Sequence, residues 1–303
     1  MPALWGIDLG GTKIEGAILR SADHPEVLTR LRVPTEKEKG YDHIINQIAL
    51  LVDNMRQETG LEPTKIGFGT PGAIDPPTQQ LKNSNTTILN GRPFLKDIET
   101  KLGIPILMAN DANCFAIAEA RMGIVMDEAP DARVVFGVIM GTGVGGGIVF
   151  NGQVWNGLQG IGGEWGHSFL DESGGDCYCG NVGCVERIIS GPSLERYYKS
   201  ISGQEKRLKE IMQLYEKDVD SAAKQTVHRL IHFFGKGIAN IVNILDPDVV
   251  ILGGGLGNID LLYSEGVDMV KKFVFNPRLD TKFLQPKLGD SAGVFGAAYL
   301  TAD

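Results

Sequence analysis

The sequence predicts an α/β fold of two domains, with helices covering sheets in three layers. Three observations predict this class. Strand-length apolar runs alternate with runs of helical period along the chain, which is typical of helices packed on sheets. The length of 303 residues favours two hydrophobic cores over one. A glycine-rich turn between two apolar runs occurs twice, once in each half of the chain.

The first half of the chain contains five runs of strand length and three segments of helical period. The predicted strands cover 3–9, 14–19, 26–33, 65–70 and 104–109, and the last is expected to be buried. The predicted helices cover 41–59, 93–102 and 111–122. Gly60 suits the end of the first helix, and Pro93 suits the start of the second. The charged segment 36–40 is expected to be a solvated turn.

The second half adds strands and a largely helical segment. Predicted strands cover 133–140, 147–150 and 248–252, and predicted helices lie at 204–218, 220–245, 260–273 and 291–300, with 190–246 mostly helical. Within the long helix, His228 and His232 are four residues apart. They lack the glutamate of an HExxH motif, so solvated or core histidines are the simpler interpretation.

The two glycine-rich turns share one pattern of strand, turn and strand. DLGGTKIEGAI covers residues 8–18 and MGTGVGGGIVFNG covers 140–152. Although GTGVGG fits GxGxxG, a strand follows it rather than the helix that a dinucleotide site requires, and no P-loop is present. One such hairpin per domain would place two sets of backbone N–H groups across a cleft, where they could bind phosphates. The candidate contacts are the turn amides and the hydroxyls of Thr12 and Thr142; plain tight turns are the alternative.

Two aspartates stand at the ends of predicted strands. Asp8 precedes the first glycine turn, where it could hold Mg²⁺ beside phosphate oxygens or merely cap the turn. Asp111 follows a predicted strand, at the edge where open α/β sheets bind ligands. It could accept the proton of an attacking alcohol in phosphoryl transfer, or cap the following helix. Lys13 could meet a phosphate or face solvent.

Three of the four cysteines and one histidine lie within eighteen residues. The segment 160–186 contains them in the pattern H-x9-C-x-C-x4-C, formed by His167, Cys177, Cys179 and Cys184. Four such ligands close together predict a structural zinc site, and nearby glycines allow the chain to wrap around the ion. Core thiols or a disulfide are the alternative. Glu164 and Glu186 flank this cysteine loop, which could present them to a polyhydroxylated ligand.

Composition excludes some partners. The net charge of −8 argues against nucleic acid and anionic membranes, both of which favour a basic surface. No apolar run approaches the roughly 20 residues of a spanning helix, and the N-terminal residues do not resemble a signal peptide. We therefore expect a cytoplasmic protein, a compartment that keeps thiols reduced for metal binding.

In the order in which they occur, the motifs resemble those of the ROK family (repressor, open reading frame, kinase) of bacterial sugar kinases, in the actin-like ATPase superfamily. The motifs span nearly the whole chain: DLGGTK at 8–13, GTPG at 69–72, NDAN at 110–113, GTGVGGG at 141–147, GEWGH at 163–167, CYCGNVGCVE at 177–186 and LGGG at 252–255. The resemblance implies a two-domain actin-like (ribonuclease H-like) fold with a cleft for nucleotide and sugar between the domains. The expected domains are residues 1–110 with about 291–303, and residues 111–290, which carry the zinc loop.

The resemblance also implies a role for individual residues. Asp111 would be the catalytic base, and His167 would bind zinc through one ring nitrogen and a sugar hydroxyl through the other. The implied sugar-binding residues are Gly72, Asn110, Asp111, Glu164, His167 and Glu186. The implied residues for ATP and Mg²⁺ are Asp8, Gly10, Gly11, Thr12, Lys13, Thr142, Gly143, Gly254 and Gly255. A homodimer is expected from the family.

The substrate preference is predicted from the particular residues within the motifs. Two segments are similar to those of fructokinases and mannokinases, KNSNTTILNGRPF at 82–94 and CYCG at 177–180. The segment GTGVGGG is also similar to that of N-acetylglucosamine kinases. We expect transfer to the C6 hydroxyl of fructose, mannose or glucose; the alternative is an N-acetylglucosamine or N-acetylmannosamine kinase. A rival of another class is a sugar-sensing protein without turnover. DNA-binding repressors of the family carry a helix-turn-helix domain ahead of the kinase-like part. Because the first phosphate loop begins at Asp8 in this sequence, we do not expect a repressor.

Overall fold

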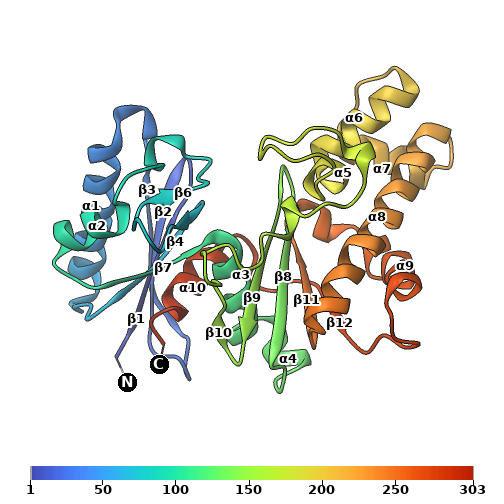
Figure 1. Ribbon diagram of the computed structural model, residues 1–303. Coiled ribbons are helices and arrows are strands. Elements are labelled where there is room, and N and C mark those ends of the chain that lie inside the picture. The colour runs from blue at the N-terminus through green and yellow to red at the C-terminus, as the bar shows by residue number, and fades with distance from the viewer. Residues whose placement is uncertain (1, 303) are drawn as a thin grey trace. The chain divides into compact units, whose positions relative to one another are not determined.

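The computed structural model describes residues 2–302, which form two compact units. Unit 1 contains the chain up to Asp131, the segment Gly147–Gly163 and the residues from Lys287 onward. Unit 2 contains Ala132–Gly146 and Glu164–Pro286. Unit 1 contains one five-stranded sheet, and unit 2 contains most of a second one (Figure 1). The alternating strands and helices confirm the α/β class predicted from the sequence.

The sheet of unit 1 has the order β3-β2-β1-β4-β7. Its strands are β1 (Leu4–Leu9), β2 (Lys13–Leu19), β3 (Val27–Pro34), β4 (Ile66–Thr70) and β7 (Ile106–Asn110). The first three form an antiparallel meander, and β1, β4 and β7 run parallel. The carboxyl ends of these three parallel strands therefore lie at one edge of the sheet.

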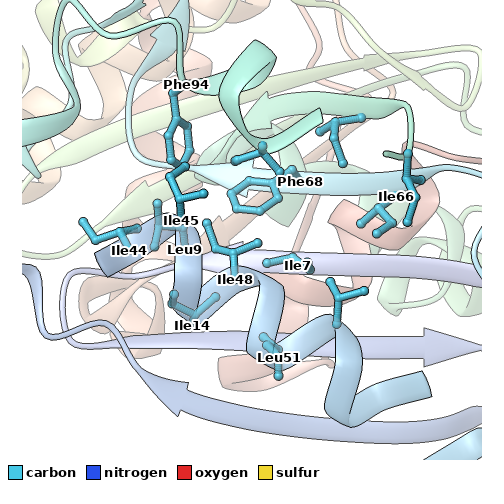
Figure 2. Packing of buried hydrophobic residues seen from close by; sticks show 14 of the residues in the cluster. Ile7, Leu9, Ile14, Ile44, Ile45, Ile48, Leu51, Ile66, Phe68 and Phe94 are labelled. Carbon is cyan, nitrogen blue, oxygen red and sulfur yellow. The ribbon is translucent and has the colours of Figure 1, made fainter. Parts of the chain in front are cut away.

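One face of this sheet packs on α1 (Tyr41–Thr59) and α2 (Phe94–Leu102) (Figure 1). Figure 2 shows Ile7 and Leu9 of β1, which are at most 1% exposed, among the side chains of this core. The apolar residues of α1 recur at i, i+3, i+4 and i+7, and they form the stripe that covers the sheet. The helix ends at Gly60, whose φ of 68° is left-handed as the sequence predicts.

The other face of the sheet packs on α3 (Asp111–Arg121) and α10 (Ala292–Tyr299), which also pack on each other. The approach of α10 requires glycine in the strands. A Cβ on Gly6 would lie 2.3 Å from the carbonyl oxygen of Val294, and one on Gly67 would lie 1.7 Å from that of Ala297. Because Gly6 and Asp8 point to the same face of β1, α10 begins beside Asp8.

Unit 2 contains a helical layer and most of the second sheet, whose order is β10-β9-β8-β11-β12. Its strands are β8 (Val134–Met140), β9 (Val144–Phe150), β10 (Gln153–Val154), β11 (Val249–Gly253) and β12 (Lys282–Leu284); β9 continues beyond Gly146 into unit 1, which also holds β10. The helices of unit 2 are α5 (Glu186–Ile189), α6 (Gly191–Ser202), α7 (Leu208–Glu216), α8 (Ser221–Leu245) and α9 (Glu265–Phe273). The helices α6, α7 and α9 pack on α8.

The remaining elements are short. They are β5 (Ala73–Ile74), β6 (Leu81–Lys82), α4 (Ile124–Glu128) and the 3₁₀ turns Lys37–Lys39, Thr87–Leu89, Trp165–His167, Glu172–Gly174, Gly255–Asn258, Asp260–Leu262 and Gly289–Ser291. Within residues 2–302, the helices lack the combination of length and apolar character that crossing a membrane requires.

The structure corrects two details of the sequence-based prediction. The strand β7 is an edge strand, and Leu107 is 42% exposed, so the expected burial of this strand is wrong on one face. The helix expected over 260–273 is divided, because a 3₁₀ turn ends at Leu262 and α9 begins only at Glu265. The charged segment 36–40 is a solvated turn, as expected, and its exposed residues Lys37–Lys39 form a 3₁₀ turn.

The compact units also differ from the domain boundaries expected at 110 and 291. Unit 1 contains α3, because α3 packs on α10 and its Glu119 carboxylate accepts backbone N–H groups from Lys287 and Leu288 at 2.8–3.1 Å.

Candidate active site

In unit 1, polar residues gather where the parallel strands β1, β4 and β7 end. The strand register pairs Asp8 with Gly69 and pairs Thr70 with Asn110. Asp111 follows directly and begins α3. The parallel register thus brings Asp8, Asn110 and Asp111 to one edge of the sheet, as the sequence predicts for strand ends in an open α/β sheet.

Asp8 is half-buried in space left by glycines. A Cβ on Gly69 would lie 3.2 Å from its Oδ1, and one on Gly293 would lie 2.9 Å from its Oδ2. Desolvation raises the pKa of Asp8 to about 7, with a further rise from the carboxylates of Asp111 and Glu15 and an opposing effect of Lys13. An acid that shares its surroundings with two other carboxylates is a good ligand for a cation.

The first glycine turn closes through its own backbone. The Gly10 N–H donates to the Lys13 carbonyl at 2.9 Å, so the turn does not depend on Asp8 for closure. Thr12 is exposed at the tip of the turn, and a Cβ on Gly10 would lie only 3.0 Å from the Lys13 oxygen. The exposed main chain of this turn is available to an anion.

Lys13 has a partner that the sequence did not suggest. Its ammonium lies 3.3 Å from the carboxylate of Glu15, which is 1% exposed. Arg30 and Arg32 also pair with Glu15, at 3.5 and 2.9 Å. Burial alone would raise the pKa of Glu15, but hydrogen bonds from Arg32 and Lys13 lower it overall. Glu15 therefore positions the cations beside the glycine turn.

The structure bears on one of the two roles considered for Asp111, that of capping the helix. Asn110 is the N-cap of α3, because its Oδ1 accepts the Asn113 N–H at 2.7 Å. Asp111 is the first residue of the helix, and its Oδ1 accepts the adjacent Ala112 N–H at 2.9 Å. The side chain is open to solvent, yet desolvation by surrounding protein still raises its pKa, an effect that the Ala112 and Asp111 amides oppose. An accessible carboxylate of raised pKa suits a general base.

Gly72 lies in the loop after β4. Its φ is 88°, and a Cβ there would lie 2.4 Å from the Lys82 carbonyl oxygen. Only glycine fits both the left-handed backbone and the close approach of β6. The residue shapes the loop that follows Thr70 at the edge where Asn110 and Asp111 lie.

In unit 2, the four expected metal ligands meet. One ligand atom from each of His167, Cys177, Cys179 and Cys184 lies within 4.8 Å of all the others. The Cys179 and Cys184 sulfurs are 3.6 Å apart, and the Cys177 sulfur is 3.6 Å from His167 Nδ1. A tetrahedron with metal–sulfur distances of about 2.3 Å has edges of about 3.8 Å. The donors therefore fit zinc, and the cysteines of residues 2–302 are free thiols rather than disulfides.

The flanking glutamates are placed by local backbone contacts. Glu164 immediately precedes the 3₁₀ turn that carries His167, so one turn presents both side chains. The Oε2 of Glu186 accepts the Val144 N–H at 2.9 Å and would lie 2.6 Å from a Cβ on Gly143. Glu186 thus connects the cysteine loop to the second glycine turn.

The other ring nitrogen of His167 also has a partner. The Tyr178 hydroxyl lies 3.0 Å from Nε2, and the two rings are edge to face with centroids 5.1 Å apart. The pKa of Tyr178 is raised to about 12; burial is the largest cause, and the negative charge of Glu186 is the next largest. Sequence reasoning did not single out Tyr178, although its place between two cysteine ligands is a signal that could have identified it.

The second glycine turn and the LGGG segment meet at the ends of β8 and β11. The register pairs Gly253 with Ile139, and a Cβ on Gly254, whose φ is 76°, would lie 2.3 Å from the Met140 carbonyl oxygen. By contrast, a Cβ on Gly255 would meet nothing within 4 Å. Thr142 is exposed at the tip of the turn. Unit 2 thus groups four of the residues expected to bind ATP, which are Thr142, Gly143, Gly254 and Gly255.

The histidine pair of α8 lies outside these groups. His228 and His232 are exposed, and their rings pack edge-on against Tyr215 and against Phe233 and Phe273. This agrees with the interpretation that they are solvated rather than ligands.

The fold and the two groups of residues define a class of protein, a sugar kinase of the actin-like ATPase fold. The chain belongs to the ROK family, whose family model matches residues 4–303. The N-acetyl-D-glucosamine kinases of Aliivibrio salmonicida and Vibrio cholerae are each 37% identical to it, over 98% of both chains. The crystal structure of a ROK hexokinase from Thermus thermophilus is 30% identical with a TM-score of 0.86, over 99% of this chain and 97% of that one.

These comparisons confirm the family and the fold expected from the motifs. They also confirm the enzyme class, because the relatives are named sugar kinases: the protein is an ATP-dependent sugar kinase.

Proposed function

We propose that the protein transfers the γ-phosphate of ATP to the C6 hydroxyl of N-acetyl-D-glucosamine. The observation that carries this proposal is that relatives of 35–37% identity, aligned over 98% of the chain, are named N-acetyl-D-glucosamine kinases. The sequence motifs alone favoured fructose, mannose or glucose as the substrate, with an N-acetylhexosamine as the alternative. The relatives favour the alternative.

In this proposal, Asp111 accepts the proton of the sugar hydroxyl as its oxygen attacks the γ-phosphorus of ATP. The P–O bond to ADP breaks, and ADP leaves with the electron pair. Most of the rate in such reactions comes from alignment and charge stabilisation, with the base assisting. The accessible carboxylate at the start of α3 supports this role, since Asn110 rather than Asp111 caps the helix.

The proposal assigns the sugar contacts to the residues that the family resemblance implies, which are Gly72, Asn110, Asp111, Glu164, His167 and Glu186. Carboxylates and amides suit a sugar because each hydroxyl both donates and accepts hydrogen bonds. The phosphates of ATP are assigned to the turn amides of Gly10, Gly11 and Gly143, the hydroxyls of Thr12 and Thr142, and Lys13. The nucleoside is assigned to Gly254 and Gly255.

Two metals complete the proposal. Asp8 would bind Mg²⁺ beside the phosphates, where the ion would neutralise negative charge. Cys177, Cys179, Cys184 and Nδ1 of His167 would bind zinc, which supplies structural cross-linking of the cysteine loop. The donor set and its spacing support this assignment. A homodimer in the cytoplasm, where ATP is available, is part of the same proposal.

The experiment is a coupled ADP-release assay over a panel of free sugars. We expect kcat/KM to be highest for N-acetyl-D-glucosamine when it is compared with N-acetyl-D-mannosamine, glucose, mannose and fructose. A higher value for any of the other sugars would reassign the substrate. If the protein binds a sugar without ATP but releases no ADP with any sugar of the panel, the sugar-sensing alternative would be favoured instead.

A further inference from the structure

Tyr178 has an unusual position for an exposed aromatic residue. It stands between Cys177 and Cys179 in the sequence, and its side chain is 80% exposed. Nevertheless its hydroxyl lies 3.0 Å from His167 Nε2, and its ring meets the imidazole edge to face at 86°. One polar contact and one ring contact thus hold an otherwise solvated side chain over His167.

The ring nitrogens of His167 determine the direction of this hydrogen bond. Nδ1 faces the Cys177 sulfur at 3.6 Å, within the group of four ligands. When Nδ1 donates its lone pair to a metal, the neutral imidazole carries its single proton on Nε2. Nε2–H is then the donor, and the Tyr178 oxygen accepts.

A single N–H donor serves one acceptor at good geometry. The proposed function assigns the same Nε2–H to a sugar hydroxyl. The Tyr178 oxygen and the sugar oxygen would therefore need the same position in front of Nε2.

Resting on that proposed function, we propose that the Tyr178 hydroxyl occupies the place of the sugar hydroxyl on His167 and that the sugar displaces it on binding. Tyr178 is thus a positioning residue that keeps the imidazole oriented while the site is empty. Its departure is inexpensive, because the ring is largely exposed and the solvent can hydrate the released hydroxyl.

The competition has a distinct consequence. Tyr178→Phe retains the ring but removes the competing oxygen, so the sugar should bind more tightly. The loss of one neutral hydrogen bond from the sugar-free state corresponds to a Kd about two- to tenfold lower. The factor should be equal for glucose and N-acetyl-D-glucosamine, because the competition concerns a hydroxyl and not the acetamido group. A residue that merely supports the loop would weaken binding when altered.

The test is calorimetric titration of the zinc-loaded protein with each sugar in the absence of ATP, for wild type and Tyr178→Phe. Tyr197→Phe is the matched control, because Tyr197 also lies in unit 2 but packs on Arg229. We expect a lower Kd only in Tyr178→Phe, with zinc content and Tm unchanged. An unchanged or raised Kd in Tyr178→Phe contradicts the competition.

A second measurement does not depend on sugar. In histidine-labelled, zinc-loaded protein, the Nε2–H resonance of His167 should exchange with water faster in Tyr178→Phe than in wild type. Equal exchange rates contradict the contact itself. If the rates differ but no sugar binds to either protein, the assignment of His167 to sugar fails, and both the proposed function and the displacement are refuted. If sugar binds equally to both, only the displacement is refuted.

Discussion

Replacing Asp111 by asparagine removes the proposed base while leaving the shape of the side chain. The structure indicates that the fold should tolerate this change. Asn110 rather than Asp111 caps α3, so the cap contribution of about 1 kcal/mol is retained. The favourable effect of a carboxylate at a helix start, about 0.3–1 kcal/mol, is opposed by the desolvation that raises the pKa of Asp111. We therefore expect the free energy of unfolding to change by less than about 1 kcal/mol.

Catalysis should respond far more strongly than stability. A general base contributes about 10²- to 10⁴-fold to a rate, which corresponds to about 3–5 kcal/mol of transition-state stabilisation. The expected result for Asp111→Asn is a fall in kcat of this size, with a sugar Kd close to that of wild type. Steady-state ADP release gives kcat, and calorimetry gives the sugar Kd.

Asp42→Asn is the matched control, because Asp42 also lies in the first turn of a helix of unit 1 and is exposed. It should leave both quantities unchanged. A kcat for Asp111→Asn within about threefold of wild type would refute the assignment of the base, since that is well below the ordinary effect of such a group.

Three further predictions follow from named contacts. Glu15→Gln should lower the free energy of unfolding by about 2–3 kcal/mol in urea denaturation, because it leaves Arg30 and Arg32 without their buried partner while both stay half-exposed. The pKa of Glu15 is lowered from 4.5 in the folded protein. The stabilisation by ionised Glu15 is therefore complete above pH 4.5 and is lost as the pH falls through the lower pKa of the folded state. The stability of Glu15→Gln should lack this part of the dependence on acidic pH. Gly254→Ala should raise the KM for ATP, because its Cβ would lie 2.3 Å from the Met140 carbonyl oxygen and would shift the segment assigned to the nucleoside; an unchanged KM for ATP would contradict this assignment. Removing zinc with a chelator should lower the Tm and weaken sugar binding, both measured by calorimetry. Metal analysis of the untreated protein should give one zinc per chain. An unchanged sugar Kd in the metal-free protein would exclude a link between zinc and sugar binding.

Features set by residues near one another in sequence could be predicted. The two glycine turns follow from short apolar runs on either side of Gly10–Gly11 and Gly141–Gly143. The ligand group follows from four soft or borderline donors in one short loop, and the structure brings all four together.

Features that depend on distant partners could not be predicted in this way. Glu15 is a lone acid in an apolar strand, and its burial depends on Arg32 of the next strand and on Ser291, which donates to it at 3.2 Å from the other end of the chain. The three-residue strand β12 exists because it pairs with β11, not because its own sequence favours a strand. The exposed face of β7 follows from its place at the sheet edge.

Adjacent polar residues posed a different difficulty. Asn110 and Asp111 are both good N-caps, and only the backbone conformation shows that Asn110 takes this role. The sequence motifs favoured fructose, mannose or glucose as substrate, whereas the relatives favour the alternative, an N-acetylhexosamine. Short motifs report the chemistry that sugar kinases share rather than the substituent that distinguishes their substrates.

The central claim is that phosphate passes from ATP to the C6 oxygen of N-acetyl-D-glucosamine. The most direct measurement is phosphorus–proton correlated NMR of the product formed by the wild-type protein from ATP and this sugar. We predict one phosphate coupled to the two C6 methylene protons, in an amount equal to the ADP formed. Coupling to the anomeric proton, or inorganic phosphate as the only new phosphorus signal, would contradict the claim.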